Sequence, residues 1–493
     1  MTNARTGGGF ASALPSTAHA GPPPGLGPFL KEVAEVLDAA GVLTDPAERE
    51  RYATPWRGPT GRTPAVLRPR STEDVAAIVR LAVAHGVRLI PQGANTGLVE
   101  ASVPDPFGAM VVLSLGRLNR RLDIDPADRT VVASAGVLLS TLNEALACHG
   151  LTMPIDVGSD PSVGGMVSTN TGGARMAHHG DVRRRVLGLE VVLAEPPGEV
   201  LDGLAALRKD NTSPRVSDWF IGAGGRFGVV TAAALEVVPM DHHAVTAFVV
   251  PTDDQAAVDL TVALEQRLGG RLRAVEALGS EALALAVAQD GVRSPFAGND
   301  AGSDTEWPHL TLLIESATAD ATEASDLEVA LVDALAALPT GLVTTAVIVP
   351  AADAWALRHG LSASLARAGT VVGFDLSVRR SRLPALRQAL DQQIRPSLPP
   401  DAILVEFGHW GDGSLHANVV FGDGRPHAQT EAGLRRRMWE LVTNLGGSWA
   451  SEHGWGPAND QALAEHGDPA RTNLLARMKA MLDPYDVLGR PRS

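Results

Sequence analysis

Alternating apolar and polar positions divide the first part of the chain into helix and strand segments. Apolar residues recur on one face of residues 28–40, and this spacing predicts a short amphipathic helix. Apolar runs predict strands at residues 65–69 and 87–90. Between them the pattern predicts a helix over residues 75–85, with Ser71 capping its start. The order strand, helix, strand predicts a β-α-β unit.

The second part of the chain repeats strands and helices with antiparallel character, which predicts a split β-α-β sheet of the ferredoxin-like kind. A polar, glycine-rich stretch at residues 291–304 predicts a mobile loop. The fold class expected from both parts is α+β. Strands are predicted at residues 246–250, 309–314, 371–377, 404–407 and 417–421, and helices at residues 254–268, 326–338 and 383–394.

The composition of the chain limits the kinds of partner and compartment that we expect. The chain has 493 residues, and 56 acidic against 42 basic residues give a net charge of −14. This charge argues against nucleic acid and against an anionic membrane surface as partners. No apolar run is long enough to span a bilayer, so no membrane span is expected. The single cysteine, Cys148, fits a reducing compartment, and we expect a cytoplasmic protein.

Two histidines flank a glycine-rich turn between the last two predicted strands. If the turn spans residues 411–414, His409 and His416 face each other across a hairpin, where Cβ atoms lie about 4.5–5.5 Å apart. Asn418 shares their face, because side chains along a strand alternate between faces. This pairing predicts that both imidazoles bind one ion.

A third ligand for that ion is expected from Glu452, which lies in a Glu-His-Gly segment further along the chain. Two histidines and one carboxylate form an open site suited to zinc or another divalent metal. The neighbouring His453 is then free to act as a base. Ordinary polar side chains on exposed strands are the plainer alternative, and the pairing of the histidines favours the metal site.

Glycine-rich loops mark three places in the first domain. Residues 91–98 contain Gly93 and Gly97, whose backbone N–H groups could converge on a phosphate. Their spacing matches neither a Walker A loop nor the dinucleotide fingerprint. Residues 160–173 form a second loop of small polar residues, suited to close approach by a large ligand. Residues 220–231 place further glycines at the entrance of a strand.

Five motifs together resemble a known family. Residues 92–98, 164–173 and 186–193 resemble the FAD-binding half of flavoproteins of the vanillyl-alcohol oxidase type. Residues 408–416 and 452–454 are similar to the C-terminal half of the D-2-hydroxyacid dehydrogenase branch of that family. The resemblance covers nearly the whole chain. It implies an FAD-binding domain (28–240), a substrate domain (241–445) and a C-terminal segment returning to the FAD domain (446–493). The Gly-, Ala-, Ser- and Pro-rich composition of the start predicts a disordered tail (1–27) before them.

The resemblance implies that the first loop holds the FAD pyrophosphate and that the second lines the flavin. The pyrophosphate loop has no histidine to carry a covalent bond, so FAD is expected to bind non-covalently. The cofactor-binding residues implied are Pro91, Gln92, Gly93, Ala94, Asn95, Thr96, Gly97, Leu98, Ser102, Asp160, Pro161, Gly164, Gly165, Ser168, Thr169, Gly173, Gly228 and Val229.

The resemblance also implies a reaction, the oxidation of a D-2-hydroxy acid to the 2-oxo acid. His453 would be the base, while Arg358 and Asn418 would hold the substrate carboxylate. Ser362 matches a position where the family places a hydroxyl. The expected partners are a small 2-hydroxy acid and an electron acceptor that the sequence does not name, and the chain could form a homodimer. An arginine exposed on a helix is the alternative for Arg358.

Some positions depart from the family pattern and keep other functions open. The family usually has Ser, Glu and Thr where this chain has Ala223, Gly224 and Arg226. The D-2-hydroxyglutarate enzymes have a lysine where this chain has Gly373, so a dicarboxylate substrate is not expected. The alternatives are a non-catalytic paralogue that serves as a binding or assembly subunit, a flavin oxidase, and a flavin-dependent transferase without net redox chemistry.

Overall fold

A computed structural model describes residues 21–490, except residues 57, 289–293, 297–306 and 423. The first twenty positions of the predicted tail and most of the loop predicted at residues 291–304 lie outside the described residues. Helix α1 (Leu26–Val36) begins inside the segment predicted as tail. The helix predicted over residues 28–40 is therefore present, shifted toward the N-terminus.

The first half of the chain opens with a small sheet in the order β1-β2-β4-β3. Strand β4 pairs in parallel with β2 and with β3, which confirms the predicted β-α-β unit. Helix α3 is capped as predicted, because the Ser71 hydroxyl accepts from the Asp74 N–H at 3.1 Å. The elements are β1 (Val42–Leu43), α2 (Pro46–Ala53), β2 (Val66–Leu67), α3 (Thr72–His85), β3 (Arg88–Gln92) and β4 (Met110–Ser114).

A second, antiparallel sheet follows, in the order β5-β6-β10-β8-β9. Its strands are β5 (Leu122–Asp125), β6 (Thr130–Ser134), β8 (Val186–Val192), β9 (Val200–Asp202) and β10 (Val229–Glu236). Short helices fill the connection between β6 and β8, namely α4 (Leu139–Ala147), α5 (Val163–Thr169), α6 (Met176–His179) and α7 (Val182–Arg185). A two-stranded pair, β7 (Leu151–Thr152) and β11 (Val238–Pro239), closes this half.

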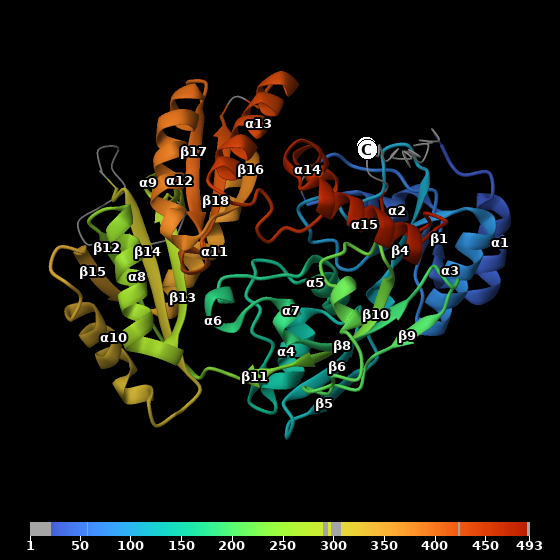
Figure 1. Cartoon of the computed structure of the whole chain (residues 1–493), viewed down its shortest axis with the longest axis horizontal. Coiled ribbons are helices and arrows are strands. Elements are labelled where there is room, and N and C mark those ends of the chain that lie inside the picture. Colours follow the sequence, from blue (N-terminus) through green and yellow to red (C-terminus); the bar gives the residue numbers. More distant parts are fainter. Residues whose placement is uncertain (1–20, 57, 289–293, 297–306, 423, 491–493) are drawn as a thin grey trace, which may run out of the picture.

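The second half is built on a seven-stranded antiparallel sheet, in the order β15-β12-β14-β13-β17-β18-β16. Its strands are β12 (His243–Pro251), β13 (Leu272–Gly279), β14 (Leu310–Thr318), β15 (Val343–Val349), β16 (Thr370–Ser377), β17 (Ala402–Gly408) and β18 (Ser414–Phe421). The α+β class is therefore confirmed, with one open sheet standing beside the two sheets of the first half (Figure 1).

Helices cover both faces of the large sheet. Four of them pack their apolar residues on one face: α8 (Asp254–Leu268), α10 (Leu327–Ala336), α12 (Leu383–Ala389) and α13 (Ala428–Asn444). On the opposite face lie α9 (Ser280–Val287) and α11 (Ala351–Ala368). The predicted helix at residues 383–394 continues beyond α12 as a π-helical turn, Leu390–Ile394.

The end of the chain returns to the first half. Helices α14 (Asp460–His466) and α15 (Pro469–Leu482) lie beside the N-terminal elements (Figure 1). Leu488 then forms a parallel bridge with Leu89 of β3, and both side chains are buried. Among the helices of the described residues, none has the length and apolar character needed to cross a membrane.

A partly buried ion pair joins the two halves. Arg175, next to α6, donates from Nε to Glu315 of β14 at 2.7 Å and lies 3.0 Å from Asp156. Glu315 is only 1% exposed and also accepts from the indole of Trp355 on α11. The Arg175 guanidinium stacks over that indole at 5.3 Å. The joint therefore fixes α11 relative to the first half.

Candidate active site

The hairpin of β17 and β18 carries both predicted histidines, in a different register from the one expected. His416 pairs with Phe407, and His409 lies beyond the end of β17. The predicted opposition of His409 and His416 is therefore wrong by two residues. Gly408, the last residue of β17, approaches Ser414 closely, and a Cβ there would lie 2.8 Å from the Ser414 carbonyl oxygen. A 3-10 turn, Trp410–Asp412, then replaces the expected four-residue turn.

The two histidines nevertheless meet, because a shift of two residues keeps a side chain on the same face. The imidazole rings of His409 and His416 lie 5.3 Å apart, edge to face. Nε2 of His409 is 3.0 Å from Oε1 of Glu452, and Nε2 of His416 is 3.1 Å from the same oxygen. The three predicted ligands thus converge with their donor atoms on one point.

A second set of donors overlaps this one. Asp375, His416, Glu452 and His453 offer ligand atoms that all lie within 4.8 Å of one another. Glu452 and His416 belong to both sets. Oδ2 of Asp375 accepts from the backbone N–H groups of Glu452 and His453 at 2.8 and 2.9 Å, whereas its Oδ1 is buried without a hydrogen-bond partner among the described residues. Both sets of donors are therefore available to an ion.

The charges around these donors suit a cation. Burial lowers the pKa of His409, but Glu276 and Glu452 outweigh it and hold that pKa well above its usual value. Burial raises the pKa of Glu452, yet the two histidines outweigh it and hold that pKa well below the ordinary range. The cluster contains three carboxylates, those of Glu276, Glu452 and Asp375, and one guanidinium, which pairs with Glu276. A bound cation would offset this excess of carboxylates.

Arg358 approaches the same cluster from helix α11. Its side chain is buried, with 8% exposed, which excludes the alternative of a solvated helix arginine. Nε donates to Glu276 at 2.7 Å, and the guanidinium stacks over the ring of Phe407 at 4.9 Å. Phe407 also contacts His416 edge to face. The guanidinium and the metal donors therefore line one site.

Two further predicted residues lie at this site. Asn418 follows His416 on the same face of β18, is 3% exposed, and its Nδ2 has no hydrogen-bond partner among the described residues. His453 stacks parallel to His416 at 5.7 Å, with its Nδ1 3.6 Å from Asp375. Ser362, one turn beyond Arg358 on α11, is exposed. Buried polar groups in a protein core normally have hydrogen-bond partners, so the unpaired amide of Asn418 is better explained as a donor to a substrate oxygen.

Two buried carboxylates were missed by sequence reasoning. Glu276 lies in β13, where every residue is buried, and Asp375 lies in β16 opposite His416. Neither belongs to a histidine motif. The available signal was an acidic residue inside an otherwise apolar strand, since such a residue is buried only when it is paired.

The first two glycine loops contact each other, as they must if both bind the same ligand. A Cβ on Gly93 would lie 2.2 Å from the hydroxyl of Ser162, whereas one on Gly97 would meet nothing within 4 Å. Asn95 takes positive φ, and its amide oxygen accepts from the Ser102 hydroxyl at 2.9 Å. Gln92 is buried and donates to the backbone carbonyls of Tyr52 in α2 and of Ser102. The loop is thus rigid on one side and open at Gly97.

The second loop reaches the metal donors. A Cβ on Gly172 would lie 3.8 Å from Oε2 of Glu452, and one on Gly454 would lie 3.4 Å from the carbonyl oxygen of Thr169. Thr169 itself is tied to Thr171 by a hydroxyl contact of 2.9 Å. Glycines without side chains let the backbone of this loop come close to a flat, extended cofactor next to Glu452 and the histidines. The residues present therefore fit FAD.

Other residues of the predicted cofactor set have structural contacts of their own. Val229 is fully buried in the core of the first half, so only its backbone could contact a ligand. A Cβ on Gly228 would lie 2.6 Å from Val191, which makes this a packing glycine. Asp160 accepts from both the backbone and the hydroxyl of Ser140.

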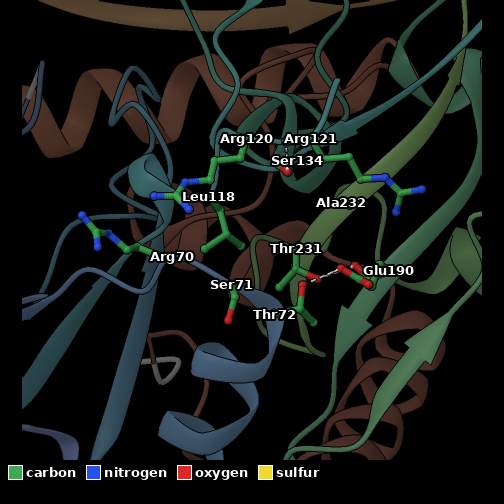
Figure 2. Close-up of a pocket in the computed structure, with 10 residues that line it drawn as sticks. All are labelled: Arg70, Ser71, Thr72, Leu118, Arg120, Arg121, Ser134, Glu190, Thr231 and Ala232. Atoms are coloured by element: carbon green, nitrogen blue, oxygen red, sulfur yellow. Dashed lines mark hydrogen bonds between the residues drawn. The ribbon is translucent and has the colours of Figure 1, made fainter. Parts of the chain in front are cut away.

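A separate cavity of about 230 Å³ lies between α3 and the second sheet (Figure 2). It shares Thr231 with the third glycine-rich segment, and it shares no residue with the first two glycine loops or with the histidine hairpin. Its charged groups are largely paired within the protein. Glu190 accepts from Thr72 and Thr231, and Arg121 pairs with Asp123 at 2.7 Å. None of the catalytic, cofactor-binding or metal-binding residues predicted from the sequence lines this cavity.

Comparison with known families gives two matches that together span most of the chain. Residues 63–202 match the model of the FAD binding domain. Residues 240–491 match the C-terminal domain of the FAD linked oxidases. The first match contains both cofactor loops, and the second contains the histidine hairpin and the Glu-His-Gly segment.

Named relatives extend over nearly the full length. D-2-hydroxyglutarate dehydrogenase of Xanthomonas citri is 32% identical over 476 residues, which cover 94% of this chain and 96% of the relative. The mitochondrial D-2-hydroxyglutarate dehydrogenase of Arabidopsis thaliana is 32% identical over 92% of this chain and 79% of its own length.

Solved structures share the fold. An alkyldihydroxyacetonephosphate synthase superposes with a TM-score of 0.74 at 16% identity, covering 96% of this chain and 86% of its own. The 4-ethylphenol oxidase of Gulosibacter chungangensis does so with a TM-score of 0.69 at 19% identity, covering 94% of this chain and 95% of its own. At such identity the likeness concerns the fold alone.

Proposed function

This chain belongs to the FAD-linked oxidases, in their branch of D-2-hydroxyacid dehydrogenases, and from that premise we propose that it oxidises a D-2-hydroxy acid with a short or apolar side chain. The products are the 2-oxo acid and a reduced flavin. The observation that carries the proposal is the convergence of His409, His416 and Glu452 beside a buried arginine.

A divalent metal, zinc in our proposal, would be held by His409, His416 and Glu452, and would supply a Lewis acid for the substrate hydroxyl. Zinc accepts this set of nitrogen and oxygen donors. The excess of carboxylates over cations at the site supports a resident cation. The proposal treats Asp375 as an outer residue that holds the Glu452–His453 backbone in place.

The protein's own residues bind and orient the substrate. Arg358 would pair with the substrate carboxylate through its Nη groups, since its Nε already binds Glu276. Asn418 would donate its unpaired amide to the same carboxylate. His453, at the open side of the cluster, would take the hydroxyl proton as the general base. Ser362 would contact the substrate from the exposed side of α11.

FAD, when bound, supplies the acceptor for the hydrogen and electron pair that leave the substrate Cα. The glycine loops at residues 91–98 and 160–173 would hold it without a covalent bond. Electrons then pass to an acceptor outside this chain. We expect denaturation of the purified protein to release its FAD, and flavin that stays attached to the denatured chain would contradict the non-covalent assignment.

The side-chain end of the substrate pocket lacks the lysine found in the D-2-hydroxyglutarate enzymes. Gly373 occupies that position on β16, opposite Asn418. Three nearby arginines could have replaced the lysine, but Arg380 is bound to Glu265, and Arg379 and Arg382 are exposed. Six residues of extended chain separate Gly373 from Arg379, about 20 Å. An unpaired distal carboxylate would thus be costly to bury.

A screen of D- and L-2-hydroxy acids with a dye acceptor tests the function. We expect D-lactate or a longer apolar homologue to have a kcat/KM at least about tenfold above that of D-2-hydroxyglutarate, because burying an unpaired charge costs more than a misfit methylene. Preference for the dicarboxylate would contradict the substrate class. Absence of turnover with every hydroxy acid would contradict the activity itself.

The metal assignment has its own test. We expect His409→Ala and His416→Ala to lose bound metal and turnover while they retain FAD, because two remaining ligands hold zinc poorly. His359→Ala on α11 is the matched control, since that exposed ring pairs with Asp156 rather than with the cluster. Undiminished metal content in both cluster variants would contradict the assignment.

A further inference from the structure

Glu276 contacts both the proposed substrate-binding arginine, Arg358, and the proposed metal ligand His409. It lies in the middle of β13 with none of its surface exposed. One carboxylate oxygen accepts from Nε of Arg358 at 2.7 Å, and the other is 2.7 Å from Nδ1 of His409. We call Arg358, which would bind the substrate, the substrate arm of the site. We call His409, which would bind the metal with His416 and Glu452, the metal arm. Both of its oxygens are therefore engaged by residues of the site, one on each arm.

We propose that Glu276 is a positioning residue that sets the geometry of the metal ligand His409 and of the substrate-binding Arg358 together. The proposal rests on the function proposed above and goes beyond it, because Glu276 contacts neither substrate nor metal. It assigns the coupling of both arms to one buried carboxylate.

The metal arm depends on Glu276 through the histidine tautomer. An ionised carboxylate can only accept hydrogen bonds, so neutral His409 must carry its proton on Nδ1. The other ring nitrogen, Nε2, is then left with its lone pair facing Glu452 at 3.0 Å. A carboxylate behind a histidine ligand is a common way to fix the ligating nitrogen. Glu276 thereby makes Nε2 the metal-binding atom.

The substrate arm depends on Glu276 through the plane of the guanidinium. Among the described residues, Arg358 has a hydrogen-bond partner only at Nε, and that partner is Glu276. The ring of Phe407 supports the guanidinium at 4.9 Å. With Nε and one face fixed, both Nη groups have no hydrogen-bond partner among the described residues and are available to a substrate carboxylate.

The substitution Glu276→Gln keeps the shape of the side chain but cannot satisfy both Arg358 and His409. A carboxamide has one acceptor oxygen, while Arg358 and the metal-binding tautomer of His409 both need an acceptor. If the oxygen stays with Arg358, the amide NH₂ faces Nδ1 of His409. His409 must then accept at Nδ1 and carry its proton on Nε2, which blocks metal binding. If the amide turns over, Arg358 loses its partner instead.

The chain offers a matched control in Glu406 on β17. Glu406 is 2% exposed and accepts from Nε of Arg387 at 3.0 Å, so it forms the same kind of buried pair in the same sheet. Arg387 belongs to α12 on the opposite face of the sheet from α11. Glu406→Gln therefore removes an equivalent buried charge without contacting His409 or Arg358.

The experiment compares full-length, FAD-loaded wild type, Glu276→Gln and Glu406→Gln. Zinc affinity is measured by competition with a chromophoric chelator, and KM and kcat for D-lactate are measured with a dye acceptor at saturating zinc. We expect Glu276→Gln to weaken zinc binding about 10–100-fold, as loss of an outer carboxylate does. We also expect its KM to stay about tenfold high after zinc saturation has restored occupancy.

The controls separate the possible failures. Glu406→Gln should match the wild type within about twofold in zinc affinity and KM, and equal losses in both variants would overturn the proposal. Zinc affinity and KM of Glu276→Gln within twofold of wild type would also overturn it, while the proposed function stands. Wild type that neither binds zinc nor oxidises a D-2-hydroxy acid would instead defeat the proposed function itself.

A second variant, Glu276→Asp, tests the proposal if Glu276→Gln does not fold. Glu276→Asp keeps both acceptor oxygens but withdraws them by one methylene, so it can reach only one partner at full strength. We expect it to lose zinc affinity or raise KM, but not both to the extent seen with glutamine. Wild-type values for both quantities in Glu276→Asp would overturn the coupling.

Discussion

At the scale of single residues, His179 on α6 is a histidine that the fold keeps neutral. Burial, followed by the neighbouring His178 and Arg273, lowers the pKa of His179 to about 3 from its ordinary value. Between that value and about 6.5, the unfolded chain binds a proton that the folded chain does not. The stability of the fold must therefore fall as the pH falls through this window.

We expect His179→Gln to remove part of that pH dependence. A full shift would cost about 2 kcal/mol between pH 7 and pH 5, and partial exposure of the ring reduces this to roughly 1 kcal/mol. Urea unfolding at both pH values measures the difference between wild type and variant. The exposed His243→Gln is the control. Equal pH dependence in wild type and His179→Gln would contradict the prediction.

Gly373 gives a second prediction at the residue scale. Because it faces Asn418 across β16 and β18, a lysine there would extend from the strand that borders the proposed carboxylate site. We expect Gly373→Lys to raise the kcat/KM ratio of D-2-hydroxyglutarate to D-lactate by tenfold or more, about 1.4 kcal/mol. Gly373→Ala adds bulk without charge, and an equal ratio in both variants would show that charge is not the cause.

At the scale of elements, the turn between β17 and β18 determines where His409 lies. Gly413 takes φ of +91°, and a Cβ there would lie 2.2 Å from the Val378 carbonyl oxygen. We expect Gly413→Ala to lower the free energy of unfolding by about 1–3 kcal/mol and to reduce zinc content, because the turn must shift. Chemical unfolding and metal analysis measure both.

The control for this turn is Gly424→Ala. Gly424 also has positive φ, +105°, but a Cβ there would meet nothing within 4 Å. Its substitution carries the backbone strain without the clash. Should Gly424→Ala cost as much stability and zinc as Gly413→Ala, the close approach to Val378 would not be what holds the hairpin.

The same hairpin marks the limit of what the sequence predicts. Periodicity located α8 with its observed bounds, Asp254–Leu268, and the Gly-Asp-Gly motif located the hairpin. The register failed because the connection is a 3-10 turn, Trp410–Asp412, followed by Gly413 at positive φ, rather than the four-residue turn that the two glycines suggested. Glu276 was missed because its partners Arg358 and His409 lie more than 80 positions away in the sequence.

At the scale of the whole molecule, Arg175 holds the two halves together through the buried Glu315. We expect Arg175→Met to destabilise the fold by about 3–5 kcal/mol, because it leaves a carboxylate buried without its cation. Arg175→Met combined with Glu315→Gln should recover part of that loss. Chemical unfolding measures both, and a double variant no more stable than the single one would contradict the explanation.

Arg121 provides the comparison for the joint. It forms an ion pair of the same length, 2.7 Å, with Asp123, but both side chains are largely exposed. We expect Arg121→Met to change the free energy of unfolding by less than about 1 kcal/mol, as exposed pairs do. A loss as large as that of Arg175→Met would show that burial is not what makes the joint strong.

The return of the chain end to β3 imposes an order on biosynthesis. Arg88 donates to the carbonyl of Asp486, 398 positions later in the sequence, and Leu89 pairs with Leu488. The whole seven-stranded sheet emerges from the ribosome between these two points, so it can fold while the cofactor half still lacks its last segment. Contacts this distant form slowly. The first half of the fold is therefore completed after the seven-stranded sheet, and a ribosome stalled before the return would present that sheet beside a first half that lacks its last segment.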